Sequence, residues 1–251
     1  MAQQLAPHCE PLWQLLNHRA ALRASLLSAD VNLHQPQLGL QSLVWNSNGI
    51  PGHLLGVTVA LQDESTPASM FVHEHYVRGI DLVANFPQSQ NQPFTVQTYW
   101  RAEKVARGVQ IDAILSLQTS LLECYPRVTI STQLPANEIW MVPPGVATAR
   151  LLTDWNSATT VPHLSATLLR GTDDSWSYCE MTHPEDQGTV EIRSPREGFC
   201  QVQRTLGGDF QEKGVIRRMR IRGVFLPRAN DLESAAEIFA DFAAAPAPLT
   251  A

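Results

Sequence analysis

Short segments in which apolar and polar residues alternate fill most of this chain, from Leu38 to about Leu226. Turn residues such as Asn48-Gly49 and Pro51-Gly52 separate the segments. A period of two places successive side chains on opposite faces of a β-strand. We count about a dozen such segments and find neither an internal repeat nor a shift in composition that would divide residues 1–251. The pattern therefore predicts an all-β fold, a single domain of two large antiparallel sheets packed face to face.

A short helix is predicted near each end of the chain. Over residues 10–28, leucines recur at helical spacing and no Gly or Pro follows Pro11. Residues 231–243 carry an apolar stripe, and Asn230 with Glu233 fits a capping box, in which two side chains satisfy the first backbone N–H groups of a helix. The strands of the sandwich then occupy residues 38–226, between the two helices.

This arrangement resembles the galactose-mutarotase-like β-sandwich, a supersandwich fold found in many sugar-handling proteins. The segment VIRRMRIRGVFLPR at 215–228, the Asn-Asp pair after it and the Pro-Leu-Thr tail also resemble uncharacterised bacterial proteins. The second resemblance covers the last forty or so residues and implies no activity. Together they imply a sandwich with a link to carbohydrates.

Charge and targeting signals exclude several classes of function. The net charge of −6 argues against a nucleic-acid binder that depends on phosphate neutralisation. No signal peptide and no apolar run of membrane-spanning length is present, so we expect a cytoplasmic protein. The four cysteines lack the spacing of a zinc site, and we expect reduced thiols at Cys9, Cys124, Cys179 and Cys200. No motif indicates a cofactor.

Polar and aromatic residues concentrate between Phe71 and Lys104. Alternation predicts strands at Phe71–Arg78 and Phe94–Arg101, separated by a loop rich in Pro and Gln. If the two strands pair as a hairpin, they bring several side chains to one polar and aromatic patch. The ligand-binding candidates in this patch are Tyr76, Arg78, Tyr99 and Arg101, with Glu74 beside them.

The sequence His73-Glu74-His75 suggests two alternative chemistries. Two histidines at i and i+2 share one face of a strand and could hold a metal, as in cupins, with Asp81 as the nearest acidic ligand. A packed, hydrogen-bonded pair of histidines is the alternative. In mutarotases a histidine acts as general acid and a glutamate as general base for ring opening. The resemblance to that fold makes catalytic candidates of five residues here, although none sits in the family's own motif: His73, Glu74, His75, Glu180 and His183.

Aromatic residues offer a third kind of candidate. Trp176 shares a strand face with Glu180, and Trp155 lies in a polar loop. Either ring could stack on the apolar face of a sugar, and the alternative is that both fill a wide core. On the last strand, Arg218, Arg220 and Arg222 share a face, where they form either an anion site or a solvated outer stripe. We favour the solvated stripe, and therefore expect Arg220→Ala to cost little free energy of unfolding. Phe239 lies in the apolar stripe of the C-terminal helix, so Phe239→Ala should cost much more.

Three functions fit these patterns. The first is a cytosolic β-sandwich that binds, or acts on, a carbohydrate or similar polyol. The second is a non-catalytic interaction protein that uses a sheet face to dock a partner or a second copy of itself. The third is a metal-dependent, cupin-like enzyme.

Overall fold

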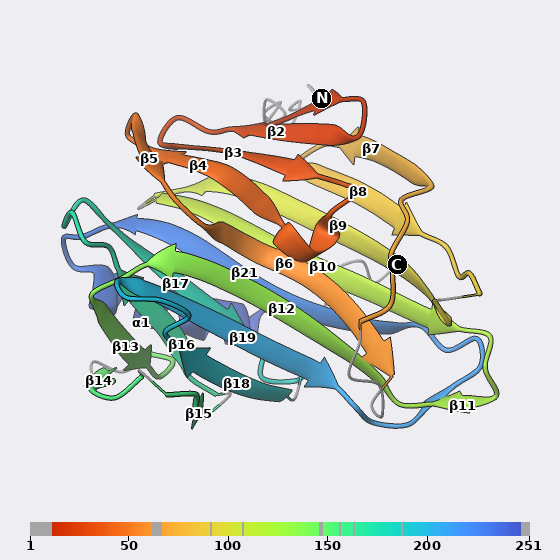
Figure 1. Ribbon diagram of the computed structural model, residues 1–251. Helices are drawn as coiled ribbons and strands as arrows, with labels where there is room; N and C mark the ends of the chain where they lie inside the picture. The colour runs from red at the N-terminus through yellow and green to blue at the C-terminus, as the bar shows by residue number, and fades with distance from the viewer. Residues whose placement is uncertain are drawn as a thin grey trace, which may run out of the picture.

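Two large antiparallel sheets packed face to face form the molecule (Figure 1). The computed structural model describes residues 12–61, 67–90, 92–106, 108–145, 148–155, 157–162, 164–186 and 188–246. Strands make up 59% of it and helix 8%, which confirms the all-β sandwich that the alternation predicts.

The first sheet has ten strands and lies at the front of Figure 1. In sheet order its strands are β1 (Trp13–Leu16), β2 (Arg19–Arg23), β3 (Leu27–Asn32), β4 (Leu40–Trp45), β6 (His53–Leu61), β12 (Pro126–Pro135), β19 (Phe199–Gly207), β18 (Gly188–Arg193) and β15 (Thr159–Val161), with β5 (Asn48–Ile50) paired to β4. A short 3-10 helix, η1 (Pro36–Leu38), crosses its outer face at β6. Gly56 permits this approach, because a Cβ there would lie 2.1 Å from the Gln37 carbonyl oxygen.

The second sheet has nine strands and lies behind the first. Its order is β14 (Arg150–Leu151), β13 (Glu138–Val142), β16 (Ala166–Arg170), β17 (Trp176–Thr182), β21 (Arg217–Pro227), β10 (Gly108–Thr119), β9 (Phe94–Val105), β8 (Asp81–Phe86) and β7 (Glu74–Arg78). At one end, β11 (Glu123–Cys124) and β20 (Gln211–Glu212) form a separate pair.

The inner faces of the two sheets form the main hydrophobic core. Trp45 from the first sheet stacks on Phe225 from the second, with ring centroids 5.5 Å apart. Trp176 and Tyr178 also contact Phe225. Large aromatic rings of this kind bury extensive apolar surface and so contribute strongly to stability.

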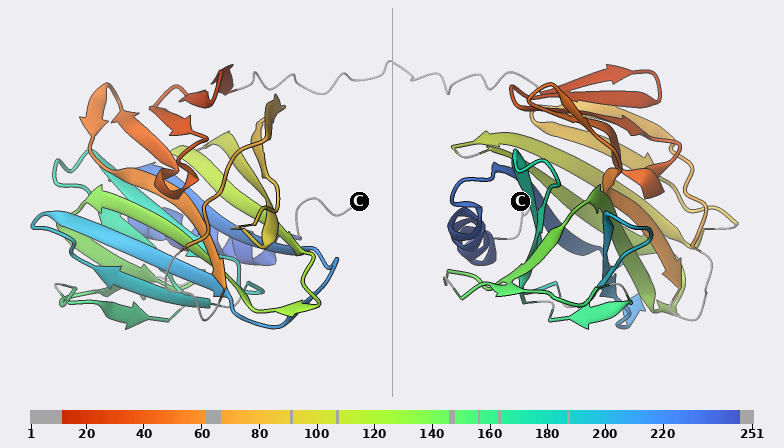
Figure 2. Two further views of the ribbon diagram at one scale, coloured as in Figure 1. Left: turned by 45° about the vertical axis from the view of Figure 1, so that its right-hand side comes forward. Right: turned by 60° about the vertical axis from the view of Figure 1, so that its left-hand side comes forward.

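The C-terminal helix α1 (Asp231–Ala244) covers part of the outer face of the nine-stranded sheet (Figure 2, right). Phe239 and Phe242 are buried there, as predicted for the helix at 231–243. The predicted capping box is wrong, because Asn230 has a left-handed backbone and makes no side-chain cap. Instead the Asp231 carboxylate accepts from the Leu232 N–H at 2.8 Å and is held by Arg170.

The predicted N-terminal helix over 10–28 is wrong for its described part, which forms β1, β2 and the start of β3. Asn17 has a left-handed backbone in a two-residue turn, after which Arg19 pairs back onto Leu16. Trp13 is buried and donates its indole N–H to the Ile80 carbonyl at 3.1 Å, whereas Leu16 is exposed. Packing against the second sheet overrides the helical spacing of the leucines.

Two strand predictions in the second sheet have different outcomes. The strand expected at 215–226 is confirmed as β21, although it begins at Arg217 and leaves Val215 and Ile216 in the preceding loop. The hairpin expected between 71–78 and 94–101 is wrong, because β8 lies between β7 and β9 and pairs with both. Residues 71–73 also lie outside β7.

Three cysteines in the described residues, Cys124, Cys179 and Cys200, are buried free thiols, as expected, and Cys9 lies outside the described residues. Within the described ranges, no helix has the length and apolar character needed to cross a membrane.

Candidate functional site

Tyr76 and Tyr99 lie on the outer face of the nine-stranded sheet, in the row that also contains Val83 of β8. The Arg78 guanidinium lies 5.9 Å from the centre of the Tyr99 ring. The predicted neighbourhood of Tyr76, Arg78 and Tyr99 therefore forms, although a third strand separates its two sides. Burial raises the pKa of Tyr99, whose ring packs against Val83 and Ile114.

Alternating charges cross the same face in the next row. Arg78, Asp81, Arg101, Asp112 and Arg222 follow one another on five adjacent strands. Arg101 holds Asp81 with two hydrogen bonds of 2.8 and 3.1 Å, and Arg222 holds Asp112 with two of 2.8 Å. Arg101, a ligand-binding candidate, and Asp81 are thus paired with each other.

The three residues that could have held a metal, His73, His75 and Asp81, do not come together as a metal site. His73 and Glu74 are exposed, whereas the Nε2 atom of His75 lies 2.7 Å from the Asn17 carbonyl oxygen, near the ring of His18. Among the residues with described positions, no group of three His, Cys, Asp or Glu side chains is arranged to hold a metal ion.

Glu180 and Trp176 lie in the core, out of reach of a ligand. Glu180 is fully buried and accepts hydrogen bonds from Arg204 at 2.9 Å, Thr132 at 2.6 Å and Tyr178 at 3.0 Å. Arg204 is also fully buried, and its remaining N–H groups bond to nearby oxygens. Both candidates are therefore structural: Glu180 joins the sheets and Trp176 fills the core.

His183 and Arg220 are buried near the end of α1. The Arg220 guanidinium donates to the His183 Nδ1 at 2.7 Å and lies 3.4 Å from the Asp186 carboxylate. Burial, and then the charge of Arg220, lower the pKa of His183. The expected solvated position of Arg220 is therefore wrong: a loop, 183–186, covers it. His183 contacts Phe242 edge-on, so it anchors the helix.

Trp155 is half-buried and packs against the main core. Its backbone carbonyl accepts a hydrogen bond from Ser194 at 2.9 Å. Three of the sequence candidates near this face are exposed: His73, Glu74 and Arg78. Tyr76 is half-buried and packs against Val83, Tyr99 and Ile114.

The outer face of the ten-stranded sheet carries a second polar surface, which the sequence candidates missed. Hydroxyl and amide side chains line up across β6, β12 and β19, and nearly all are uncharged. Gln201 donates to Ser131 at 3.1 Å, and the hydroxyls of Thr129 and Thr205 lie 3.4 Å apart. Gln203, between them, is half-buried, and its side chain makes no hydrogen bond to any described residue.

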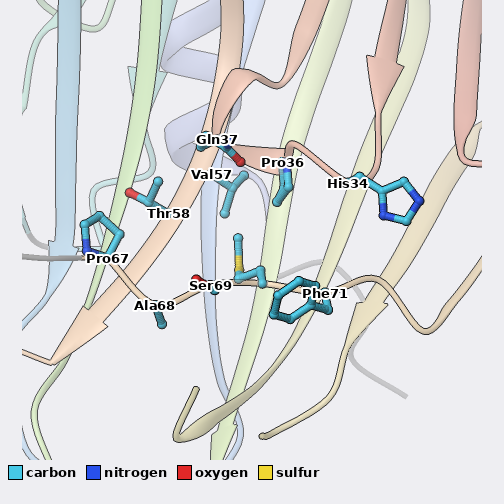
Figure 3. Close-up of a pocket in the computed structure, with 10 residues that line it drawn as sticks. His34, Pro36, Gln37, Val57, Thr58, Pro67, Ala68, Ser69 and Phe71 are labelled. Atoms are coloured by element: carbon cyan, nitrogen blue, oxygen red, sulfur yellow. The ribbon is translucent and has the colours of Figure 1, made fainter. Parts of the chain in front are cut away.

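A cavity of about 360 Å³ adjoins this surface (Figure 3). Pro36 and Gln37 of η1 form one side, β6 contributes Thr58, and the segment 67–71 forms the other side. The Phe71 ring is 67% exposed although it lines the cavity. We call this cavity and the polar surface beside it the sheet-face groove.

One signal in the sequence could have pointed to this groove. In the segments 127–133 and 201–205, every outward position of the alternation is Arg, Thr, Ser or Gln. Outer faces of sheets commonly carry Lys, Glu and other charged pairs instead. A run of uncharged hydrogen-bonding residues therefore distinguishes this face from an ordinary solvated one.

Comparison of the sequence with known protein families and with curated proteins finds no match.

Solved structures share the fold at low sequence identity. A galactose mutarotase-like protein from Lactobacillus casei superposes with a TM-score of 0.52 and 9% identity, over 82% of this chain and 99% of that one. A candidate aldose 1-epimerase from Escherichia coli K12 gives 0.57 and 8%, over 82% and 98%. An α-galactosidase of glycoside hydrolase family 36 from Geobacillus stearothermophilus gives 0.53 and 11%, over 83% of this chain and 40% of that one. The fold is thus a galactose-mutarotase-like β-sandwich.

Proposed function

We propose that this protein binds a neutral carbohydrate or a similar polyol in the sheet-face groove. A sugar hydroxyl both donates and accepts hydrogen bonds, and Thr, Ser and Gln side chains do the same. Such groups line the groove, together with Arg127, whereas carboxylates are nearly lacking among its described lining residues. This chemistry suits an uncharged ligand with many hydroxyl groups.

The exposed ring of Phe71 is the observation that carries this proposal. It stands beside the polar groups of Gln37, Thr58 and Ser69 in one cavity. A pyranose ring has an apolar face and a polar edge, and so it fits a site where an aromatic ring adjoins hydrogen-bonding groups. The carbohydrate-active relatives of the fold support the same ligand class by analogy.

We propose binding rather than catalysis at this site. Ring opening of an aldose needs an acid and a base that reach the same sugar. Among the described lining residues, His34 lies in the first cavity and Asp209 lies beyond β19 at the opposite end of the face. Among the described lining residues of the groove, the imidazole and the carboxylate therefore lie in different cavities.

Titration with galactose, glucose and N-acetylgalactosamine, followed by calorimetry and by chemical-shift changes, tests the proposal. Phe71→Ala should weaken binding about ten-fold or more, which corresponds to about 1.4 kcal/mol. Leu16→Ala, which removes an equally exposed apolar side chain from β1 at the edge of the sheet, is the matched control and should leave the affinity unchanged. Failure of all three sugars to bind at millimolar concentration, or equal affinity of the Phe71 variant, would overturn the proposal.

Self-association is a second candidate function, supported by a different surface. Two loops at the β11–β20 end expose large apolar side chains next to one another. They are Leu121, Leu122, Tyr125, Phe210, Val215 and Ile216. Exposed apolar groups that cluster, rather than scatter, commonly mark an interface.

A second copy of this chain is the occupant that the surrounding charges favour. Three acidic and three basic residues border the cluster: Glu123, Asp209, Glu212, Lys213, Arg217 and Arg218. Such a balanced rim can pair with itself, whereas an anionic membrane would favour a basic one. Sedimentation of the wild type should show a dimer, and Leu122→Glu should give a monomer. If the wild type stays monomeric in a concentration series that rises in 100-fold steps to millimolar, self-association is excluded.

A further inference from the structure

The sheet-face groove continues well beyond the cavity beside Phe71. A second cavity of about 380 Å³ lies over β6, β12 and β19, and a third of about 440 Å³ lies over β12, β19 and β18. The first and second share Thr58 and Pro67, and the second and third share Arg127 and Thr205. Because neighbours share lining residues, the three cavities form one continuous trough.

The trough runs across the strands of the sheet. It passes from η1 over β6, β12 and β19 to β18, which are successive neighbours. Strands in a sheet lie about 4.8 Å apart, so the path from β6 to β18 alone covers about 14 Å. A single sugar ring would occupy one cavity and leave the other two to water.

Each cavity has its own chemistry. The first offers the Phe71 ring, and the second offers a floor of hydroxyl and amide groups around Gln203, whose side-chain amide has no partner among the described residues. The third is floored by three glycines, Gly188, Gly207 and Gly208, and bordered by Thr189. A Cβ on Gly208 would meet nothing within 4 Å, so the lack of a side chain there leaves the third cavity open to a ligand that extends from the second. Arg127 and Asp209 also line this cavity.

From this geometry we infer that the ligand is a linear chain of neutral sugars, with one unit in each of three consecutive cavities. The inference rests on the proposed function and specifies its ligand. The stacking contact on Phe71 holds one terminal unit. Gln203 bonds to the hydroxyls of the middle unit, and the glycine floor receives the third.

A length series tests the inference. Malto-oligosaccharides and β-1,4-linked galacto-oligosaccharides of one to five units are titrated by calorimetry against the full chain. For a chain type that binds, affinity should rise at least ten-fold between one and three units and then level off. Gln203→Ala should reduce the affinity for three units more than the affinity for one.

A blocked groove provides the internal control. Thr189→Trp places a bulky ring at the exposed border of the third cavity, and it should abolish the gain from the third unit while leaving the monosaccharide affinity unchanged. Thr95→Trp makes the same replacement at an exposed position of the other sheet and should change neither.

The outcomes separate the two proposals. Equal affinity for one and three units, with binding still lost in Phe71→Ala, would overturn the chain-length inference and leave the sugar site standing. If the wild type binds no sugar of any length, both the sugar site and the chain-length inference are overturned. An undiminished gain from the third unit in Thr189→Trp would also overturn the three-cavity assignment.

Discussion

Glu180 on β17 and Arg204 on β19 form an ion pair, with Oε1 2.9 Å from Nε, that joins the two sheets inside the sandwich. Both side chains are essentially inaccessible to solvent, and every strong hydrogen-bonding group around them is satisfied. A buried charge without a partner is far less stable than a buried pair.

Removal of one partner from this pair should destabilise the fold strongly. Arg204→Met leaves the Glu180 carboxylate buried and unpaired, and we expect a loss of about 3–5 kcal/mol in the free energy of unfolding. The double replacement Arg204→Met with Glu180→Leu should recover much of that loss. Urea unfolding measures both. Arg23→Met, at an exposed ion pair with Asp30, should cost less than about 1 kcal/mol, and equal effects of Arg204→Met and Arg23→Met would contradict the prediction.

Phe239 on α1 is the main anchor of the helix. Its ring is fully buried against the outer face of the nine-stranded sheet. Phe239→Ala should lower the free energy of unfolding by about 3–5 kcal/mol, because it removes buried apolar contacts and leaves a cavity. Ala244→Ser, at the exposed last position of the helix, serves as the control in the same urea experiment. A Phe239 variant that unfolds like the wild type would show that the helix does not stabilise the sheet.

Arg220 should behave as a buried residue. Arg220→Ala removes a charged hydrogen bond to the His183 ring and the partner of the half-buried Asp186 carboxylate, and we expect a cost of about 1.5–3 kcal/mol. Arg218→Ala, two residues away on an exposed part of the strand, is the matched comparison and should cost less. If the two variants lose the same free energy, the loop 183–186 does not cover Arg220 in solution.

Stability should fall as pH is lowered below about 6.5, the pKa of an unfolded histidine. The pKa of His183 is lowered in the folded state, so the unfolded state binds more protons as pH falls. The stability that neutral His183 contributes is therefore present above that pH and lost below it. Asp186 changes stability in the opposite direction and at lower pH, because burial raises the pKa of its carboxyl above the usual 3.8. One proton limits the slope to about 1.4 kcal/mol per pH unit.

Unfolding by urea between pH 7.5 and pH 5.5 measures this dependence. His183→Gln should flatten the slope over that interval, because glutamine does not titrate. His53 also has a lowered pKa and faces the outer surface, so His53→Gln should be tested in parallel. An unchanged slope in the His183 variant would assign the dependence to other groups.

The sequence predicts those parts of the fold in which local pattern and packing agree. Strand β21 and helix α1 are examples, because alternation and the apolar stripe each match the surface that the element buries. The stretch 12–28 fails, since its leucines repeat at helical spacing while the buried residues, such as Trp13 and Leu22, are set by the opposite sheet. A distant partner decides that choice, and no local window contains it.

The site could be predicted less well than the fold. Aromatic and charged residues attract attention in a sequence, but Trp176, Glu180 and Arg220 are all buried in the structure. Buried charges depend on partners that are distant in the sequence, such as Arg204 on β19 for Glu180 and Asp186 in the loop 183–186 for Arg220. The groove residues, in contrast, are ordinary Thr, Ser and Gln, and only the sheet order brings them together.

The position of β21 has a consequence for synthesis of the chain. Among the described residues it is the last strand in sequence, yet it lies in the middle of the nine-stranded sheet, between β10 and β17. While the ribosome has not yet released residues 217–227, β10 and β17 each present an unpaired, apolar edge, and such edges recruit other chains. The nine-stranded sheet therefore cannot close during synthesis until residues 217–227 emerge, and the two open edges persist until then.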